Sequence, residues 1–220
     1  MISTRIFLTA SVAALLATTP ADAGAQLGSQ QGLVEPNVAA DSTIAALPHL
    51  NTSIAEALRA ARPILSVVTL DSILSTKSVT RGQRTALYAM LFVHVDINRG
   101  SDAEFMLIPG MDARRLGVIK AGRPWKDFED FQTAMARASN AAEATRMEQY
   151  LFIPIELNTF TESIMDSFAS IGVGTRQWKR EFAEYRPWRD MAQFERDIGK
   201  YLRSRPTEVN RLARYVIIAP

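Results

Sequence analysis

The sequence lacks cysteine and contains only two histidines, His49 and His94, among its 220 residues. The absence of cysteine excludes a disulfide framework, a thiolate zinc site and a cysteine nucleophile. Two histidines are too few for a histidine-rich metal site, and they weaken any interpretation as a Ser-His-Asp hydrolase. The sequence also has no glycine-rich phosphate loop followed by lysine. We therefore expect that the protein is not an enzyme and uses no metal and no small-molecule cofactor.

A strong excess of one charge is absent as well. The chain has 25 lysines and arginines against 23 aspartates and glutamates, a formal net charge of +2, so the whole molecule has no strong field to attract polyanions. Most of its basic residues are arginines, whose planar guanidinium suits phosphate and carboxylate. With 47% hydrophobic and 22% charged residues, the composition is that of an ordinary globular protein.

The first 25 residues have the pattern of a cleavable signal peptide. Arg5 supplies a positive start, residues 6–16 are apolar and uncharged, and small residues at 21–23 or 23–25 fit a cleavage site. The apolar run is shorter than the about 20 residues that a membrane-spanning helix needs. We expect an exported protein, periplasmic or secreted, without stable membrane insertion after signal cleavage. A retained anchor is the alternative.

Residues 26–48 show no helical or strand periodicity. They are rich in glycine, glutamine, alanine, serine and asparagine, and Pro36 and Pro48 interrupt any regular element. This composition predicts a flexible tether between the signal peptide and the folded part.

An internal duplication follows the tether. The order apolar residue, acid, apolar residue, asparagine occurs at 95–98 and again at 155–158, and Arg-Pro-Trp occurs at 123–125 and at 186–188. Each copy closes on a tyrosine followed by apolar residues, at 150–153 and at 215–218. Self-similarity at a fixed period indicates a repeated structural unit, and small length differences between copies belong in loops. We expect one copy at 93–153 and another at 154–220.

An eroded third copy is indicated at 49–92, upstream of these two. Arg62 and Pro63 lie 61 residues before Arg123 and Pro124, and Tyr88 takes the place of the closing tyrosine. Arg62 follows Asn51 by only eleven positions, whereas Arg123 follows Asn98 by 25, so we expect its hairpin to be missing.

The pattern of apolar residues and helix caps predicts an all-α protein made of short helices with tight turns. Ser101 with Glu104 forms a capping box that opens one such helix. We expect one compact body from about residue 49 to residue 220, in which the two hairpins share a core. Leu107, Leu116, Phe168 and Trp178 are predicted to be buried there.

Each copy has a short capped helix, a turn containing glycine and a second helix that opens with basic residues. With its turns at 108–110 and 172–174 and its Gly-Arg-Pro-Trp at 122–125, the chain resembles the tandem helix-hairpin-helix DNA-binding family, in the form found in exported competence-type DNA receptors. The resemblance covers roughly residues 93–202. It implies duplicated helix-hairpin-helix repeats with short connecting helices. It also implies binding of double-stranded DNA along its phosphate backbone, without sequence preference.

Physical chemistry supports that function. Glycine allows a left-handed turn and the close approach of a phosphate, and N–H groups at the turn and at the next helix N-terminus can bind an anion. Contacts of this kind give affinity without sequence choice. The candidate nucleic-acid-binding residues are Gly172, Val173, Gly174, Thr175, Arg176, Lys179 and Arg180 in the later copy and Gly110, Met111, Arg114 and Arg115 in the earlier one.

Other interpretations remain open. Asp112 stands where a second hairpin glycine is expected, and its carboxylate would repel phosphate or cap the following helix. The turn at 172–174 can be a plain helix connector, and Arg176, Lys179 and Arg180 alternate with acids as on a solvated face. The alternative function is therefore an exported protein-interaction or scaffold module that keeps the fold, has a protein partner and does not bind nucleic acid.

Overall fold

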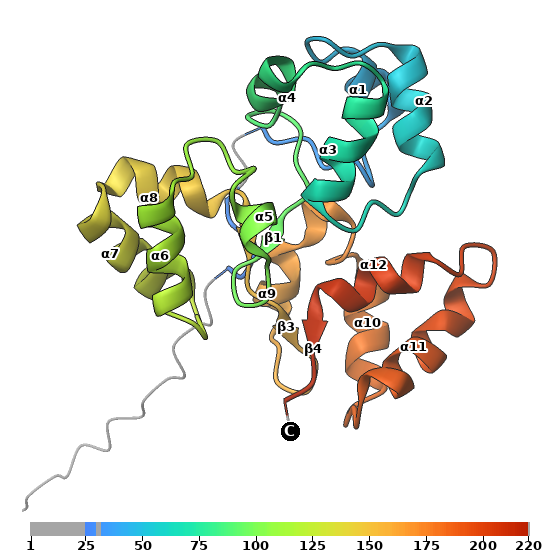
Figure 1. Ribbon diagram of the computed structural model, residues 1–220. Helices are drawn as coiled ribbons and strands as arrows, with labels where there is room; N and C mark the ends of the chain where they lie inside the picture. The colour runs from blue at the N-terminus through green and yellow to red at the C-terminus, as the bar shows by residue number, and fades with distance from the viewer. Residues whose placement is uncertain (1–24, 30–31, 220) are drawn as a thin grey trace, which may run out of the picture.

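The computed structural model describes residues 25–29 and 32–219, and these residues are mostly helical (Figure 1). The all-α prediction is confirmed, whereas the predicted signal peptide lies almost wholly outside the described residues. The helices are α1 (Asp41–Ala45), α2 (Thr52–Ala60), α3 (Val67–Thr76), α4 (Arg81–Leu87), α5 (Asp102–Phe105), α6 (Ala113–Ala121), α7 (Phe128–Ala138), α8 (Ala141–Glu148), α9 (Glu162–Ser167), α10 (Arg176–Glu184), α11 (Met191–Gly199) and α12 (Glu208–Arg214), with the 3-10 helices η1 (Ala169–Ile171) and η2 (Lys200–Leu202).

Short parallel strand pairs divide these helices into three segments. Strands β1 (Val95–Asp96) and β2 (Leu151–Phe152) pair with each other, as do β3 (Ile155–Glu156) and β4 (Val216–Ile217). A single parallel bridge between Val34 and Leu91 occupies the corresponding place earlier in the chain. We call residues 34–92, 95–152 and 155–217 the first, second and third segments. In Figure 1, α2–α4 of the first segment, α6–α8 of the second and α10–α12 of the third form three groups around the central strands.

The same hydrogen bonds fasten the start of each segment to its middle. An asparagine side chain accepts a backbone N–H and donates to a backbone C=O further along the chain. The pairs are Asn37 with Ile64, Asn98 with Trp125 and Asn158 with Trp188.

An arginine before a cis-proline donates to two more carbonyls near that asparagine in every segment. These arginines are Arg62, Arg123 and Arg186. The start and the middle of each segment are therefore joined by the same local arrangement of hydrogen bonds.

The predicted tether at 26–48 is wrong over its described residues. Leu27 is buried and bridges Phe152, while α1 forms the first short helix of the first segment. Asn37 lies 25 residues before Arg62, which is the spacing found in the second segment. The first hairpin is also present, because His49, with φ of 65°, connects α1 to α2. Buried side chains and side-chain hydrogen bonds, rather than periodicity, fix this stretch.

The hydrophobic residues form two clusters rather than the single shared core expected. One cluster extends through the first and second segments, where Phe92 contacts Tyr150 at a ring distance of 4.9 Å. The other fills the third segment and includes Leu27 and Phe152. The two hairpins predicted from the sequence therefore lie in different clusters. Phe168 and Trp178 are buried as predicted, whereas Leu107 and Leu116 are only half-buried.

Candidate nucleic-acid interface

The hairpin of the third segment connects α9 and η1 to α10. Gly172 has a φ of 74°, in the left-handed region that favours glycine. Thr175 then caps α10, because its hydroxyl accepts the backbone N–H of Trp178 at 3.4 Å. The chain thereby turns sharply and presents the first turn of α10 to solvent, with Thr175, Arg176 and Gln177 exposed.

The backbone N–H groups of this turn do not face outward as the sequence suggested. Gly172 donates to the carbonyl of Ala169 at 3.0 Å, and Val173 and Gly174 both donate to Phe168, at 3.2 and 3.0 Å. The turn amides therefore satisfy the carbonyls that end the preceding helix. The first N–H groups of α10 still have no acceptor within the helix, so any anion contact has to use them.

Gly174 has a different role from the one expected. Its φ is not in the left-handed region, which among the described glycines is occupied by Gly32, Gly110 and Gly172. A Cβ at Gly174 would overlap the backbone carbonyl of Met165. Glycine is needed here so that the two helices can approach each other closely, and not for contact with a phosphate.

The second segment repeats the turn with a different cap. Gly110 has a φ of 75°, Met111 is buried, and Asp112 caps α6 by accepting the N–H of Arg115 at 2.8 Å. That backbone hydrogen bond, together with the Arg115 guanidinium, lowers the pKa of Asp112 below its usual value. Asp112 therefore has the capping position that Thr175 has in the third segment, one of the two roles expected from the sequence.

A buried or half-buried arginine lies against each of these two turns. Neither of these two arginines was identified from the sequence as part of the site. Arg146 of α8 donates to the carbonyl of Pro109 at 2.6 Å, and Arg211 of α12 donates to Ile171 at 2.8 Å. A glutamate three residues earlier pairs with each of them. The readable signal was an arginine four residues before the closing tyrosine in both segments. These two arginines stabilise the hairpins, and their guanidinium groups are already bound to a hairpin carbonyl and a glutamate.

The predicted cations differ in how much of their charge is available. Arg176 and Arg114 are exposed and make no ion pair within the part of the chain that the structure describes. Lys179 pairs with Asp166, and Arg180 pairs with the buried Glu181 at 2.5 Å.

In the second segment the remaining predicted cation is compensated. Arg115 pairs with Asp112 and, at 3.6 Å, with Glu143, and it also donates to the carbonyl of Gly110. Each hairpin thus keeps one exposed cation outside ion pairs, Arg114 in the second segment and Arg176 in the third.

Two basic clefts flank the start of α10. The first, which we call the inter-segment groove, has a volume of about 950 Å³ and is lined by residues of the first and third segments. The second, the α10 cleft, has a volume of about 1090 Å³. Arg176 and Gln177 line both. The basic residues are Arg59, Arg62, Arg176, Arg205 and Arg211 in the groove and Arg176, Lys179, Arg180 and Arg186 in the cleft.

The repeated acids have structural partners. Asp96 and Glu156 each accept the backbone N–H groups two and three residues later, so they shape the start of the second and third segments. His94 is fully buried, with its Nδ1 3.3 Å from Glu35. Within the described ranges no three His, Cys, Asp or Glu side chains are grouped so that they could hold a metal ion. No helix in that part of the chain is both long and apolar enough to traverse a lipid bilayer.

Comparisons with known protein families, with curated protein sequences and with solved structures find no match to this chain.

Proposed function

We propose that the three segments are copies of a helix-hairpin-helix unit and that the protein is exported and binds double-stranded DNA along its phosphate backbone, without sequence preference. The observation that supports this most is the charge around the start of α10. The two clefts that meet there are lined by eight different arginines and lysines and by two acids, Glu162 and Glu208. Such a local excess attracts phosphates even though the whole chain is nearly neutral.

The proposed contact differs from the one that the sequence suggested. The turn amides of the third hairpin are already bonded, so the phosphate would be bound by the first N–H groups of α10, with the Thr175 hydroxyl and the Arg176 guanidinium beside them. Backbone amides and arginine side chains at a helix start contact phosphate rather than base edges. Binding is therefore expected to be insensitive to sequence.

The second candidate function is a protein-interaction module that keeps the fold and does not bind nucleic acid. Lys179 and Arg180 are paired with acids, and Asp112 places a carboxylate at the second hairpin. These contacts reduce the charge that phosphate would meet. The choice between the two functions thus depends on the charge that remains at Arg176 and in the inter-segment groove.

A gel shift of the purified protein against several unrelated blunt duplexes, at two salt concentrations, tests the proposal. We expect all duplexes to bind alike and to dissociate at the higher salt concentration. Arg176→Ala should weaken binding to every duplex. Arg137→Ala, which removes an exposed arginine of α7, is the matched control and should leave binding unchanged. Absence of binding by the folded protein would favour the interaction module.

A further inference from the structure

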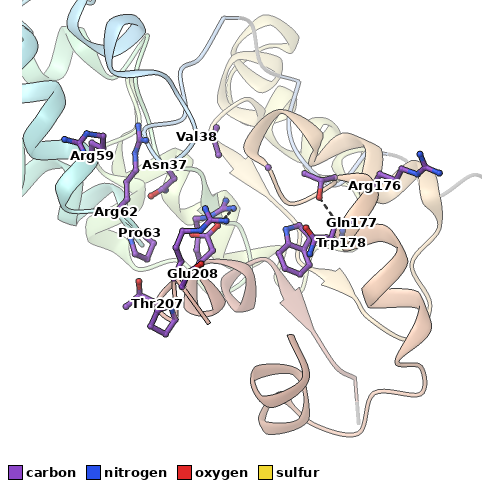
Figure 2. A pocket seen from close by; sticks show the side chains of 16 residues that line it. Asn37, Val38, Arg59, Arg62, Pro63, Arg176, Gln177, Trp178, Thr207 and Glu208 are labelled. Atoms are coloured by element: carbon purple, nitrogen blue, oxygen red, sulfur yellow. Dashed lines mark hydrogen bonds and ion pairs between the residues drawn. The ribbon is translucent and has the colours of Figure 1, made fainter. Parts of the chain in front are cut away.

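The inter-segment groove is built by parts of the chain that are more than a hundred residues apart. Figure 2 shows Arg59, Arg62 and Pro63 of the first segment on one side and Gln177 and Trp178 of the third segment on the other. Val38 lies near the third hairpin, since a Cβ at Gly172 would be 3.1 Å from its Cγ1. The groove therefore exists only because the first segment packs beside the third hairpin.

The groove has a strong excess of positive charge. Five arginines line it, against Glu208 as its acid, and Glu208 is already paired with Arg211 at 2.6 Å. Arg205 is exposed and makes no ion pair among the described residues, while Arg59 pairs with Asp41 at 2.9 Å in an exposed position. Exposed pairs of that kind are weak and readily exchange for another anion. Arg59 of the first segment and Arg205 of the third segment thus both offer guanidinium groups to a ligand in the groove.

The size of the groove limits which anion can enter it. A volume of about 950 Å³ is that of a pocket for a drug-sized molecule, which corresponds to a few nucleotides. A duplex, which has two strands wound around each other, is too bulky to enter a space of that volume. Pro63, Pro206 and the edge of Trp178 add apolar lining. A positively charged groove that follows the backbone is typical of sites for one unpaired strand.

We propose that the inter-segment groove binds a single unpaired strand of nucleic acid, in addition to the duplex contact at α10. This inference rests on the proposed function, because both sites meet at Arg176, whose guanidinium in Figure 2 extends away from the first-segment wall. Arg176 and Gln177 line both the groove and the α10 cleft. A strand that leaves the end of a bound duplex can therefore continue into the groove.

The test compares a blunt duplex, the same duplex with a short single-stranded tail, and the isolated single strand, by fluorescence anisotropy. We expect the tailed duplex to bind about tenfold more tightly than the blunt one, as for one or two added charge-assisted hydrogen bonds. Arg59→Ala and Arg205→Ala should remove that gain. They should weaken blunt-duplex binding much less than Arg176→Ala does, because for a blunt duplex they only add to the local field. Arg137→Ala should change neither.

The possible outcomes separate the two proposals. If the blunt duplex binds but the tail adds nothing, or if the tail's gain survives both groove variants, the groove is not the strand site and the duplex proposal stands. If no nucleic acid binds at all, the proposed function itself fails. Inorganic polyphosphate is the third probe. Competition by polyphosphate as strong as that by a single strand of equal phosphate content would overturn the assignment to nucleic acid.

Discussion

The side chain of Asn158 and the backbone of Trp188 form a pair of reciprocal hydrogen bonds across 30 residues of sequence. The Asn158 amide donates to the Trp188 carbonyl at 2.9 Å and accepts the Trp188 N–H at 2.7 Å. Asn98 makes the same pair with Trp125, and Asn37 makes it with Ile64. This contact fixes how far the hairpin of each segment lies from its third helix.

Asn158→Ala should therefore destabilise the protein by about 2–4 kcal/mol, because two hydrogen bonds are lost and two half-buried backbone groups remain unpaired. The measurement is the free energy of unfolding in urea. Asn210→Ala, which changes an exposed asparagine of α12, should change stability by less than about 0.5 kcal/mol. Equal effects of the two substitutions would show that the reciprocal hydrogen bonds between Asn158 and Trp188 contribute nothing.

Two glycine-to-alanine substitutions should change stability in opposite directions. At Gly174 a Cβ overlaps the carbonyl of Met165, so Gly174→Ala should cost about 1–3 kcal/mol or more. At Gly117, inside α6, a Cβ meets nothing within 4 Å, so Gly117→Ala should stabilise by up to about 1 kcal/mol. Thermal melting of both variants checks this pair. A melting temperature unchanged by Gly174→Ala would contradict the close packing of α9 and α10.

Asp112→Asn separates capping from charge at the second hairpin. Asparagine caps about as well as aspartate, so helix content should be kept. The unfolding free energy should fall only by the small contribution of an exposed ion pair. Removal of the carboxylate should raise duplex affinity by up to about fivefold or leave it unchanged, since exposed ion pairs contribute little. A clear fall in affinity with the fold intact would mean that Asp112 assists binding.

Stability should fall in acid through the carboxylates at the second hairpin. The Arg115 backbone N–H lowers the pKa of Asp112, and hydrogen bonding from Arg146 lowers that of Glu143. Because both values are lower in the folded state, their stabilisation is present above the ordinary carboxyl pKa of about 4 and is lost as the pH falls through the folded values. Urea midpoints measured between pH 7 and pH 3 test this. Glu143→Gln should make the decline shallower, and an unchanged decline would exclude a role for Glu143.

Much of the segment pattern was readable from the sequence. The spacing of Asn98 to Arg123 and the recurring Arg-Pro pairs marked residues that hold the same contacts in the structure. The first copy of this pattern, with Asn37, was missed because the prolines and small residues around it resemble a linker. Asn37 lies 25 residues before Arg62, and that spacing would have revealed it.

The chemistry of the turns could not be predicted in the same way. Whether the N–H of Gly174 faces solvent or Phe168 depends on where the preceding helix ends, and no spacing in the sequence fixes that end. The inter-segment groove was also unpredictable, because Arg59 and Arg205 come together only through the packing of distant segments. The sequence thus located basic residues near α10, and tertiary structure determined which of them can meet a ligand.

The central claim is that phosphates bind at the start of α10, and the salt dependence of blunt-duplex binding tests it most directly. The slope of log Kobs against log salt concentration should be negative, at about −0.9 for each phosphate contact. Arg176→Ala should make it shallower by about 1, and Arg137→Ala should not change it. A slope near zero, or one that Arg176→Ala leaves unchanged in a folded protein, would contradict the account.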